Sequence, residues 1–203
     1  MRKLPNILSF GRLLLTIPIV VLILINTPTA YLIATALFFV GSVSDTLDGR
    51  LARKYHLVSN MGVFLDLTAD KILVSSGLIA LVQIEAVPAW IVIIIVTREF
   101  LVSGLRSLAA AQGVVIPAGR WGKQKTLLTL LALGGILLGR GLHGRTAFPL
   151  GLSTAAHGPT QFADYLLGLA DAILLLAVLW TVISAYEYLR GAWGLLTKAA
   201  DSE

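Results

Sequence analysis

The residues best suited to chemistry are acidic and lie close together in the chain. Four of the eleven acidic residues fall within one stretch of 26 residues: Asp45, Asp48, Asp66 and Asp70. On helices, the first two project from one face and the last two, four residues apart, form a second stripe. If the short charged connection between the two helices lets them lie antiparallel with these faces opposed, the four carboxylates meet in one pocket.

Four neighbouring carboxylates repel one another unless a cation neutralises them. The set contains no His and the chain has no Cys, so its oxygen donors suit hard Mg²⁺ or Mn²⁺ rather than Zn²⁺. Mg²⁺ favours sites that it shares with substrate phosphates, and this indicates a phosphorylated or pyrophosphate substrate. Gly49 and Ala52 leave space for a ligand on the face of Asp45 and Asp48, and Arg53 offers a planar fork of donors to a phosphate.

Two plainer interpretations each explain part of the pattern. Small residues on a membrane helix commonly serve helix packing. Acidic residues within a membrane can also form the ion or proton relay of a transporter, for which Asp171 is the main further candidate. Asp171 is otherwise expected to be a hydrogen-bonded packing residue, and Asp164 and Glu85 are expected nearer the outer interface. Neither interpretation requires all the fixed positions between Asp45 and Asp70.

The composition indicates what must position these residues. Of the 203 residues, 57% are apolar and 13% charged, and the mean hydropathy is +0.86, which excludes an ordinary water-soluble globule. A spanning helix needs about 20 mostly apolar residues, and six such runs occur: residues 9–25, 31–48, 64–82, 88–108, 121–138 and 163–188. The expected fold is all-α, a single domain over residues 1–203 with six transmembrane helices.

Arg2 and Lys3 follow Met1, and a short interfacial segment containing Asn6 and Arg12 is expected to lead into the first span. A cleavable signal peptide is the alternative for this beginning. Its removal would leave five spans and unbalance the distribution of charge. The interfacial segment is therefore preferred.

Basic residues gather in the connections on one side of the six spans. They are Arg2, Lys3, Arg12, Arg50, Arg53, Lys54, Arg106, Arg120, Lys123, Lys125, Arg190 and Lys198. By the positive-inside rule this side, with both termini and the acidic cluster, is cytoplasmic. The exceptions, Arg140 and Arg145, lie in the segment of about residues 139–162, which is expected to be a flexible external loop. The net charge of +5 then reflects topology and contact with anionic lipid rather than nucleic acid.

The stretch from Asp45 to Asp70 resembles, at every fixed position, the signature of the CDP-alcohol phosphotransferases, D-x2-D-G-x2-A-R-x8-G-x3-D-x3-D. The resemblance implies an integral-membrane enzyme with six core helices, in which a second alcohol displaces CMP from a CDP-linked alcohol. It implies that Asp45, Asp48, Asp66 and Asp70 hold metal, and that Asp70 is also the catalytic base. By the same resemblance, Asp45, Gly49, Ala52, Arg53 and Asp66 form the CDP site, and Gly62 permits close helix approach.

Cationic residues outside this signature indicate the acceptor. Arg98 and Arg106 lie about 80° apart around one helix, so both can border one cavity. Placing two arginines within a hydrophobic run is energetically costly, and an acceptor that bears a phosphate would explain why they are there. Glu99 can neutralise a neighbouring cation. Lys123 and Lys125 point in roughly opposite directions on a helix, so only one of them can face the pocket. Their alternative role is to anchor lipid headgroups.

Three further segments resemble blocks of the phosphatidylglycerophosphate synthases within this superfamily: residues 5–12 (PNILSFGR), 98–106 (REFLVSGLR) and 122–126 (GKQKT). The resemblance implies CDP-diacylglycerol as donor, sn-glycerol 3-phosphate as acceptor, a bacterial inner membrane and, as is common in the family, a homodimer. Arg98, Arg106 and one of Lys123 and Lys125 would then clamp the acceptor phosphate, with Asn6 and Arg12 as donor-side candidates. Inositol phosphate is the competing acceptor, because it too presents a phosphate.

Overall fold

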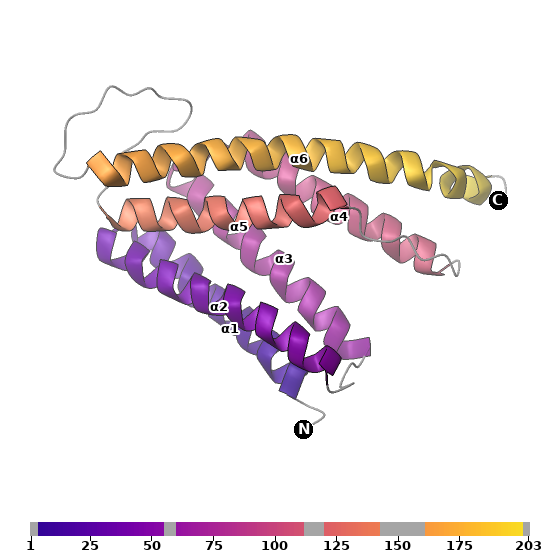
Figure 1. The fold of residues 1–203 in the computed structure, drawn as a ribbon, viewed down its shortest axis with the longest axis horizontal. Helices are drawn as coiled ribbons and strands as arrows, with labels where there is room; N and C mark the ends of the chain where they lie inside the picture. The colour runs from indigo at the N-terminus through magenta and orange to yellow at the C-terminus, as the bar shows by residue number, and fades with distance from the viewer. Residues whose placement is uncertain (1–3, 55–59, 112–119, 143–160, 201–203) are drawn as a thin grey trace.

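The computed structural model describes residues 4–54, 60–111, 120–142 and 161–200. For residues 4–9, 45–54, 60–64, 66, 120, 123, 161 and 192–200 it describes the backbone only. These ranges form six helices and contain no strand (Figure 1). The helices are α1 (Leu4–Ile25), α2 (Pro28–Lys54), α3 (Asn60–Gln83), α4 (Ala89–Ala111), α5 (Arg120–Gly141) and α6 (Gln161–Ala200). The all-α class expected from the sequence is confirmed.

Each expected apolar run coincides with one helix, and the two ends of the chain show the main differences. α1 begins at Leu4, so the expected interfacial segment is the first part of α1 rather than a separate piece. Pro5 permits this because the first turn of a helix has no internal partner for its backbone N–H groups. α6 continues to Ala200, well past the expected end at residue 188, and no proline interrupts it.

The described helices differ in how well their length and apolar composition suit a membrane span. One segment, Phe162–Gly191 of α6, is long and apolar enough to cross a membrane, and Phe10–Ile25 and Pro28–Ser44 are shorter apolar helices. Large hydrophobic side chains are nevertheless exposed on each of the six helices, among them Ile17, Phe39, Ile79, Ile93, Leu127 and Leu169, all more than half exposed. Six membrane spans stay a prediction.

The turn between α1 and α2 shows why this boundary was predictable. Asn26 adopts a left-handed conformation with φ 55°, which Asn tolerates better than most residues. Its Oδ1 accepts a hydrogen bond of 2.7 Å from the Tyr31 hydroxyl. Thr27 Oγ1 accepts a bond of 3.4 Å from the backbone N–H of Ala30 and so caps the start of α2.

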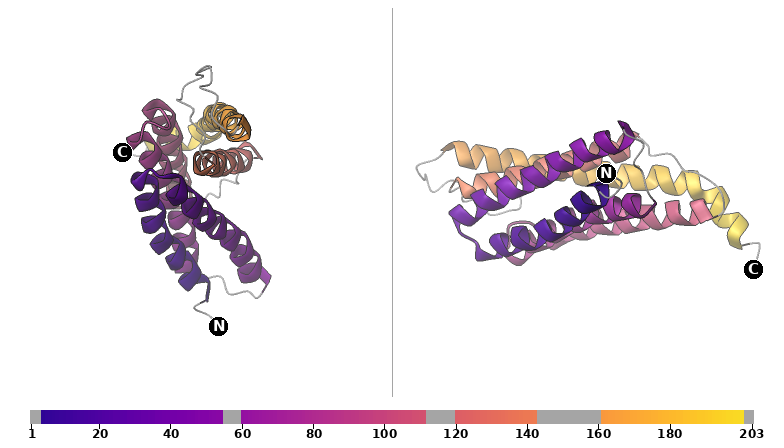
Figure 2. Two further views of the ribbon diagram at one scale, coloured as in Figure 1. Left: turned by 90° about the vertical axis from the view of Figure 1, so that its left-hand side faces the viewer. Right: turned by 90° about the horizontal axis from the view of Figure 1, so that it is seen from below.

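Helix α3 occupies the centre of the bundle. It packs against α1, α4 and α5, and Leu73 reaches α2 at Gly41. α5 and α6 pack along their length, and α4 lies beside the C-terminal half of α6 (Figures 1 and 2). Small residues permit the α5–α6 approach, since a Cβ on Gly135 would lie 2.9 Å from the Cβ of Ala170. Residues 70 and 71 of α3 are thereby placed between α4 and α5.

Candidate active site

The four acidic residues of the signature lie on two helices, two on α2 and two on α3. The side chain of Asp70 lines a small cavity of about 30 Å³ together with Lys71, Glu99 and Lys125. The other three acidic side chains, and those of Asn6, Gly49, Ala52, Arg53, Gly62 and Lys123, lie outside the described part. Among the described side chains there is no group of three or more His, Cys, Asp or Glu that could hold a metal. The four-carboxylate metal site stays a prediction.

The contact between α2 and α3 bears on this prediction. A Cβ added to Gly41 would lie 3.8 Å from Cδ2 of Leu73, which is ordinary van der Waals contact. The acidic positions of α2 follow Gly41 by four and seven residues, and those of α3 precede Leu73 by three and seven residues. Residues at these offsets share a helix face. By helical spacing the acidic positions are therefore expected on the same sides of α2 and α3 as Gly41 and Leu73.

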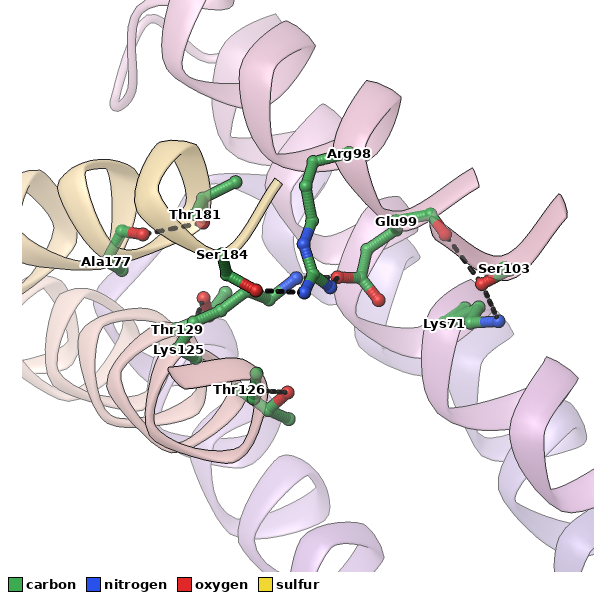
Figure 3. Close-up of polar contacts among 11 residues, drawn as sticks. Lys71, Arg98, Glu99, Ser103, Lys125, Thr126, Thr129, Ala177, Thr181 and Ser184 are labelled. Atoms are coloured by element: carbon green, nitrogen blue, oxygen red, sulfur yellow. Dashed lines mark hydrogen bonds and ion pairs between the residues drawn. The ribbon is translucent and has the colours of Figure 1, made fainter. Parts of the chain in front are cut away.

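A cluster of charged side chains from α4 and α5, in contact with α6, lies beside this cavity (Figure 3). Arg98 of α4, only 8% exposed, donates from Nη1 to Oε1 of Glu99 at 2.9 Å and from Nη2 to Oγ of Ser184 on α6. Its Cζ also lies 5.5 Å from the ring centre of Tyr188, a cation–π distance. Lys125 of α5, 3% exposed, pairs with the same Glu99 oxygen. One carboxylate oxygen thus joins two buried cations.

Lys71 is a cation of the site that the sequence analysis missed. Its Nζ donates a hydrogen bond of 2.5 Å to Oγ of Ser103, and Ser103 donates to the backbone carbonyl of Glu99 at 2.6 Å (Figure 3). Because Lys71 directly follows Asp70, its place in the sequence was the one available signal. Its bond to α4 is a tertiary contact that periodicity does not reveal.

The structure places some of the predicted acceptor residues beside the cavity and others away from it. Arg98 and Lys125 are buried in one cluster, and Lys125 lines the cavity. Arg106 is exposed on α4 and does not line this cavity, although its charge acts on Lys71. Arg12, a donor-side candidate, is buried on α1 with 4% of its surface exposed. The structure therefore groups two of the predicted acceptor residues with Lys71.

A second polar group lies at the opposite end of the bundle. Arg140 of α5 places its Cζ 5.8 Å from the ring centre of Tyr31 on α2, and its charge acts on Asp171 of α6. The side chain of Arg140 thus packs on a neighbouring helix of the bundle. Arg140 is one of the two exceptions to the expected distribution of basic residues. Arg145, the other exception, and most of the expected external loop lie outside the described residues.

The sequence of this chain matches the family model described as CDP-alcohol phosphatidyltransferase over residues 2–183. The chain therefore belongs to the CDP-alcohol phosphatidyltransferase family, and it is an enzyme of phosphatidyl transfer. The family is generally dependent on divalent metal ions. This match confirms the family expected from the acidic signature and favours an enzyme over a transporter.

Curated relatives resemble the chain over most of its length. A CDP-diacylglycerol–glycerol-3-phosphate 3-phosphatidyltransferase of Bacillus subtilis is 37% identical, over 97% of this chain and 98% of the relative. An enzyme of the same name from Rickettsia typhi is 34% identical, over 94% of this chain and 97% of the relative. A probable phosphatidylglycerophosphate synthase of Mycobacterium tuberculosis is 35% identical, over 94% of this chain and 81% of the relative. The expected similarity to this group of synthases is confirmed.

Proposed function

We propose that this enzyme transfers the phosphatidyl group from CDP-diacylglycerol to sn-glycerol 3-phosphate, giving phosphatidylglycerol phosphate and CMP. The observation that carries the choice of acceptor is the pair of buried cations, Arg98 and Lys125, beside the cavity that Asp70 lines. The names of the relatives from Bacillus subtilis and Rickettsia typhi agree with both substrates.

Burial of these two cations supports an acceptor that bears a phosphate. Removing an ammonium or guanidinium group from water is costly unless an anion compensates it. A guanidinium carries five N–H donors, and Nε of Arg98 is buried without a hydrogen-bond partner among the described residues. An acceptor phosphate supplies both negative charge and several acceptor oxygens. An acceptor without a phosphate, such as serine, offers the two cations only the single negative charge of its carboxylate.

On the donor side, the proposed metal site is formed by Asp45, Asp48, Asp66 and Asp70. Its all-oxygen donor set fits Mg²⁺ or Mn²⁺, and the contact of Gly41 on α2 with Leu73 on α3 supports the pairing of these positions. When bound, the ion would neutralise charge on the diphosphate of the donor. In this proposal Gly49, Ala52 and Arg53 line the CDP site with Asp45 and Asp66, Gly62 permits close helix approach, and Asn6 and Arg12 are weaker donor-side residues.

The chain's own residues would orient the acceptor and remove its proton. Arg98 and Lys125 hold its phosphate, while Arg106, which is exposed, and Lys123 are the weaker candidates. Asp70, which lines the same cavity as Lys125, takes the proton of the attacking hydroxyl. The hydroxyl oxygen forms a bond to the phosphorus that carries diacylglycerol, and the bond from that phosphorus to CMP breaks. Positioning of this kind supplies much of the catalysis in phosphoryl transfer.

The proposed setting is a bacterial inner membrane that all six helices span. Exposed apolar side chains on each helix support this, as does the gathering of basic residues in the connections on one side. The cavity then lies toward the cytoplasm, where a lipid donor and a water-soluble acceptor can meet. Basic residues at that face would contact anionic lipid, and a homodimer stays a further prediction.

The test is a panel of acceptors with the purified full-length protein. CMP release from CDP-diacylglycerol is measured with glycerol 3-phosphate, inositol 1-phosphate or serine, with Mg²⁺ or Mn²⁺ and with a chelator. CMP release is expected with glycerol 3-phosphate and is expected to stop with the chelator. Activity with inositol 1-phosphate but none with glycerol 3-phosphate would reject this choice of acceptor.

A further inference from the structure

Glu99 is in contact with both buried cations of the site. Its Oε1 contacts both Nη1 of Arg98 and Nζ of Lys125, so it is bound to the two cations proposed to hold the acceptor. It also lines the cavity together with Asp70. Its side chain is 21% exposed, whereas those of Arg98 and Lys125 are 8% and 3% exposed. Of the three groups, the carboxylate is the most exposed to solvent.

The single carboxylate of Glu99 does not neutralise both cations. Arg98 and Lys125 carry two positive charges, and a single carboxylate compensates one of them. A phosphate monoester dianion would compensate both and would offer more acceptor oxygens. Lys71 and Asp70 also line the cavity and add one positive and one negative charge, so the excess of one positive charge remains. A phosphate in the cavity therefore competes with Glu99 for the same donors.

We propose that Glu99 is an internal anion that the phosphate of the acceptor displaces from Arg98 and Lys125. Glu99 thereby sets the affinity of the enzyme for acceptors that bear a phosphate. The inference rests on the proposed function and deepens it, because it assigns a specificity-determining role to a residue next to the acceptor site. Displacement requires only the side chain to move, since the backbone of Glu99 lies within α4 and its carbonyl accepts the bond from Ser103.

A purely positioning role for Glu99 makes the opposite prediction. If the carboxylate holds the two cations in the geometry that the phosphate needs, loss of its charge weakens acceptor binding. If the carboxylate competes with the phosphate, loss of its charge strengthens acceptor binding. Glu99→Gln separates the two, because it keeps the shape of the side chain and an oxygen acceptor but removes the negative charge.

The kinetic test measures the KM for glycerol 3-phosphate in CMP release, with Glu99→Gln compared with the unaltered enzyme. The KM is expected to fall about threefold to tenfold, because the charged carboxylate no longer competes with the phosphate for the donors of Arg98 and Lys125. Inhibition by inorganic phosphate is expected to strengthen by a similar factor. Glu187→Gln is the matched control, since Glu187 is exposed on α6 outside this cluster, and its KM should not change. An unchanged or raised KM in Glu99→Gln would overturn the proposal.

A binding test decides the question independently of turnover. The thermal unfolding midpoint is measured with increasing inorganic phosphate and, separately, glycerol 3-phosphate, because a ligand that binds the folded state raises this midpoint. At any one ligand concentration the rise of the midpoint should be larger in Glu99→Gln than in the unaltered protein, because the stabilisation grows with the ratio of ligand concentration to Kd. An equal or smaller rise would contradict displacement.

A second variant covers the outcome in which Glu99→Gln does not fold. Glu99→Asp keeps the charge but shortens the reach by one methylene, so at equal ligand concentration it should also enlarge the rise of the midpoint, but by less than Glu99→Gln. A smaller rise than in the unaltered protein would overturn the proposal. Failure of the unaltered enzyme to release CMP with glycerol 3-phosphate would instead reject the proposed function, and the binding test would still decide the role of Glu99.

Discussion

Lys71 of α3 and Ser103 of α4 are joined by a hydrogen bond of 2.5 Å from Nζ to Oγ. The bond fixes a cation one residue after Asp70 and ties α3 to the helix that carries Arg98. Because Lys71 lines the same cavity as Lys125, the site combines positive charge from three helices, α3, α4 and α5. This relationship extends the proposed acceptor site beyond the residues that the sequence indicated.

The first prediction concerns Lys71 itself. Lys71→Met keeps most of the apolar stem but removes the ammonium group, so kcat/KM for glycerol 3-phosphate should fall about tenfold to a hundredfold, as expected for a lost charged hydrogen-bond partner. Steady-state CMP release checks this. Ser103→Ala keeps the ammonium group but removes its anchor and the bond to the Glu99 carbonyl, and it should give a smaller loss. A greater loss in Ser103→Ala would show that the hydroxyl matters more to the reaction than the ammonium.

The second prediction concerns the proposed base. Asp70→Asn removes the proton acceptor while keeping the size of the side chain, and the rate of CMP release should fall by about 10²–10⁴-fold, the range of general-base catalysis. Binding of CDP-diacylglycerol, measured by equilibrium binding to the purified protein, should be largely retained. A variant with a near-normal rate would remove Asp70 from the role of base.

The sequence predicted the fold of this chain well for identifiable reasons. Long apolar runs separated by turn residues mark the helices, and at the α1–α2 boundary Asn26 and Thr27 have the turn and cap geometry that their types favour. Helix ends were less predictable, because α6 continues to Ala200 through a stretch in which strong helix formers are mixed with the helix-disfavouring Gly191 and Gly194. The early start of α1 is similar, since Pro5 is compatible with either a loop or a first helical turn.

The site was predictable only where its residues share a helix face or a motif. Fixed spacing identified the acidic positions and the family to which they belong, and a hydrophobic context identified Arg98. The bond from Arg98 to Ser184 and that from Lys71 to Ser103 join helices distant in sequence. Helical periodicity carries no information on such contacts, so these partners could be found only in the structure.

The third prediction distinguishes the two lysines that the sequence left equivalent. Lys125 is buried and lines the cavity, so Lys125→Gln should raise the KM for glycerol 3-phosphate by at least about tenfold, since it removes a charged contact to the phosphate. Lys123→Gln, two residues away, is the matched comparison and should change the KM less than about twofold, because only one of the two lysines can face the pocket. The KM values of both variants are measured in the same detergent. An equal effect of the two substitutions would contradict the assignment of Lys125.

The fourth prediction tests the approach of α2 and α3 that supports the proposed metal site. A Cβ on Gly41 would make ordinary contact with Leu73 at 3.8 Å, so Gly41→Ala should be tolerated. Gly41→Leu should force the two helices apart, since overpacking displaces neighbouring backbone, and should raise the Mg²⁺ concentration for half-maximal CMP release by about tenfold or more, the factor equivalent to 1.4 kcal/mol of binding free energy. Gly168→Leu is the control, because nothing lies within 4 Å of a Cβ at Gly168. An unchanged Mg²⁺ requirement in Gly41→Leu, with the control active, would show that the spacing of α2 and α3 at Gly41 does not govern the metal site.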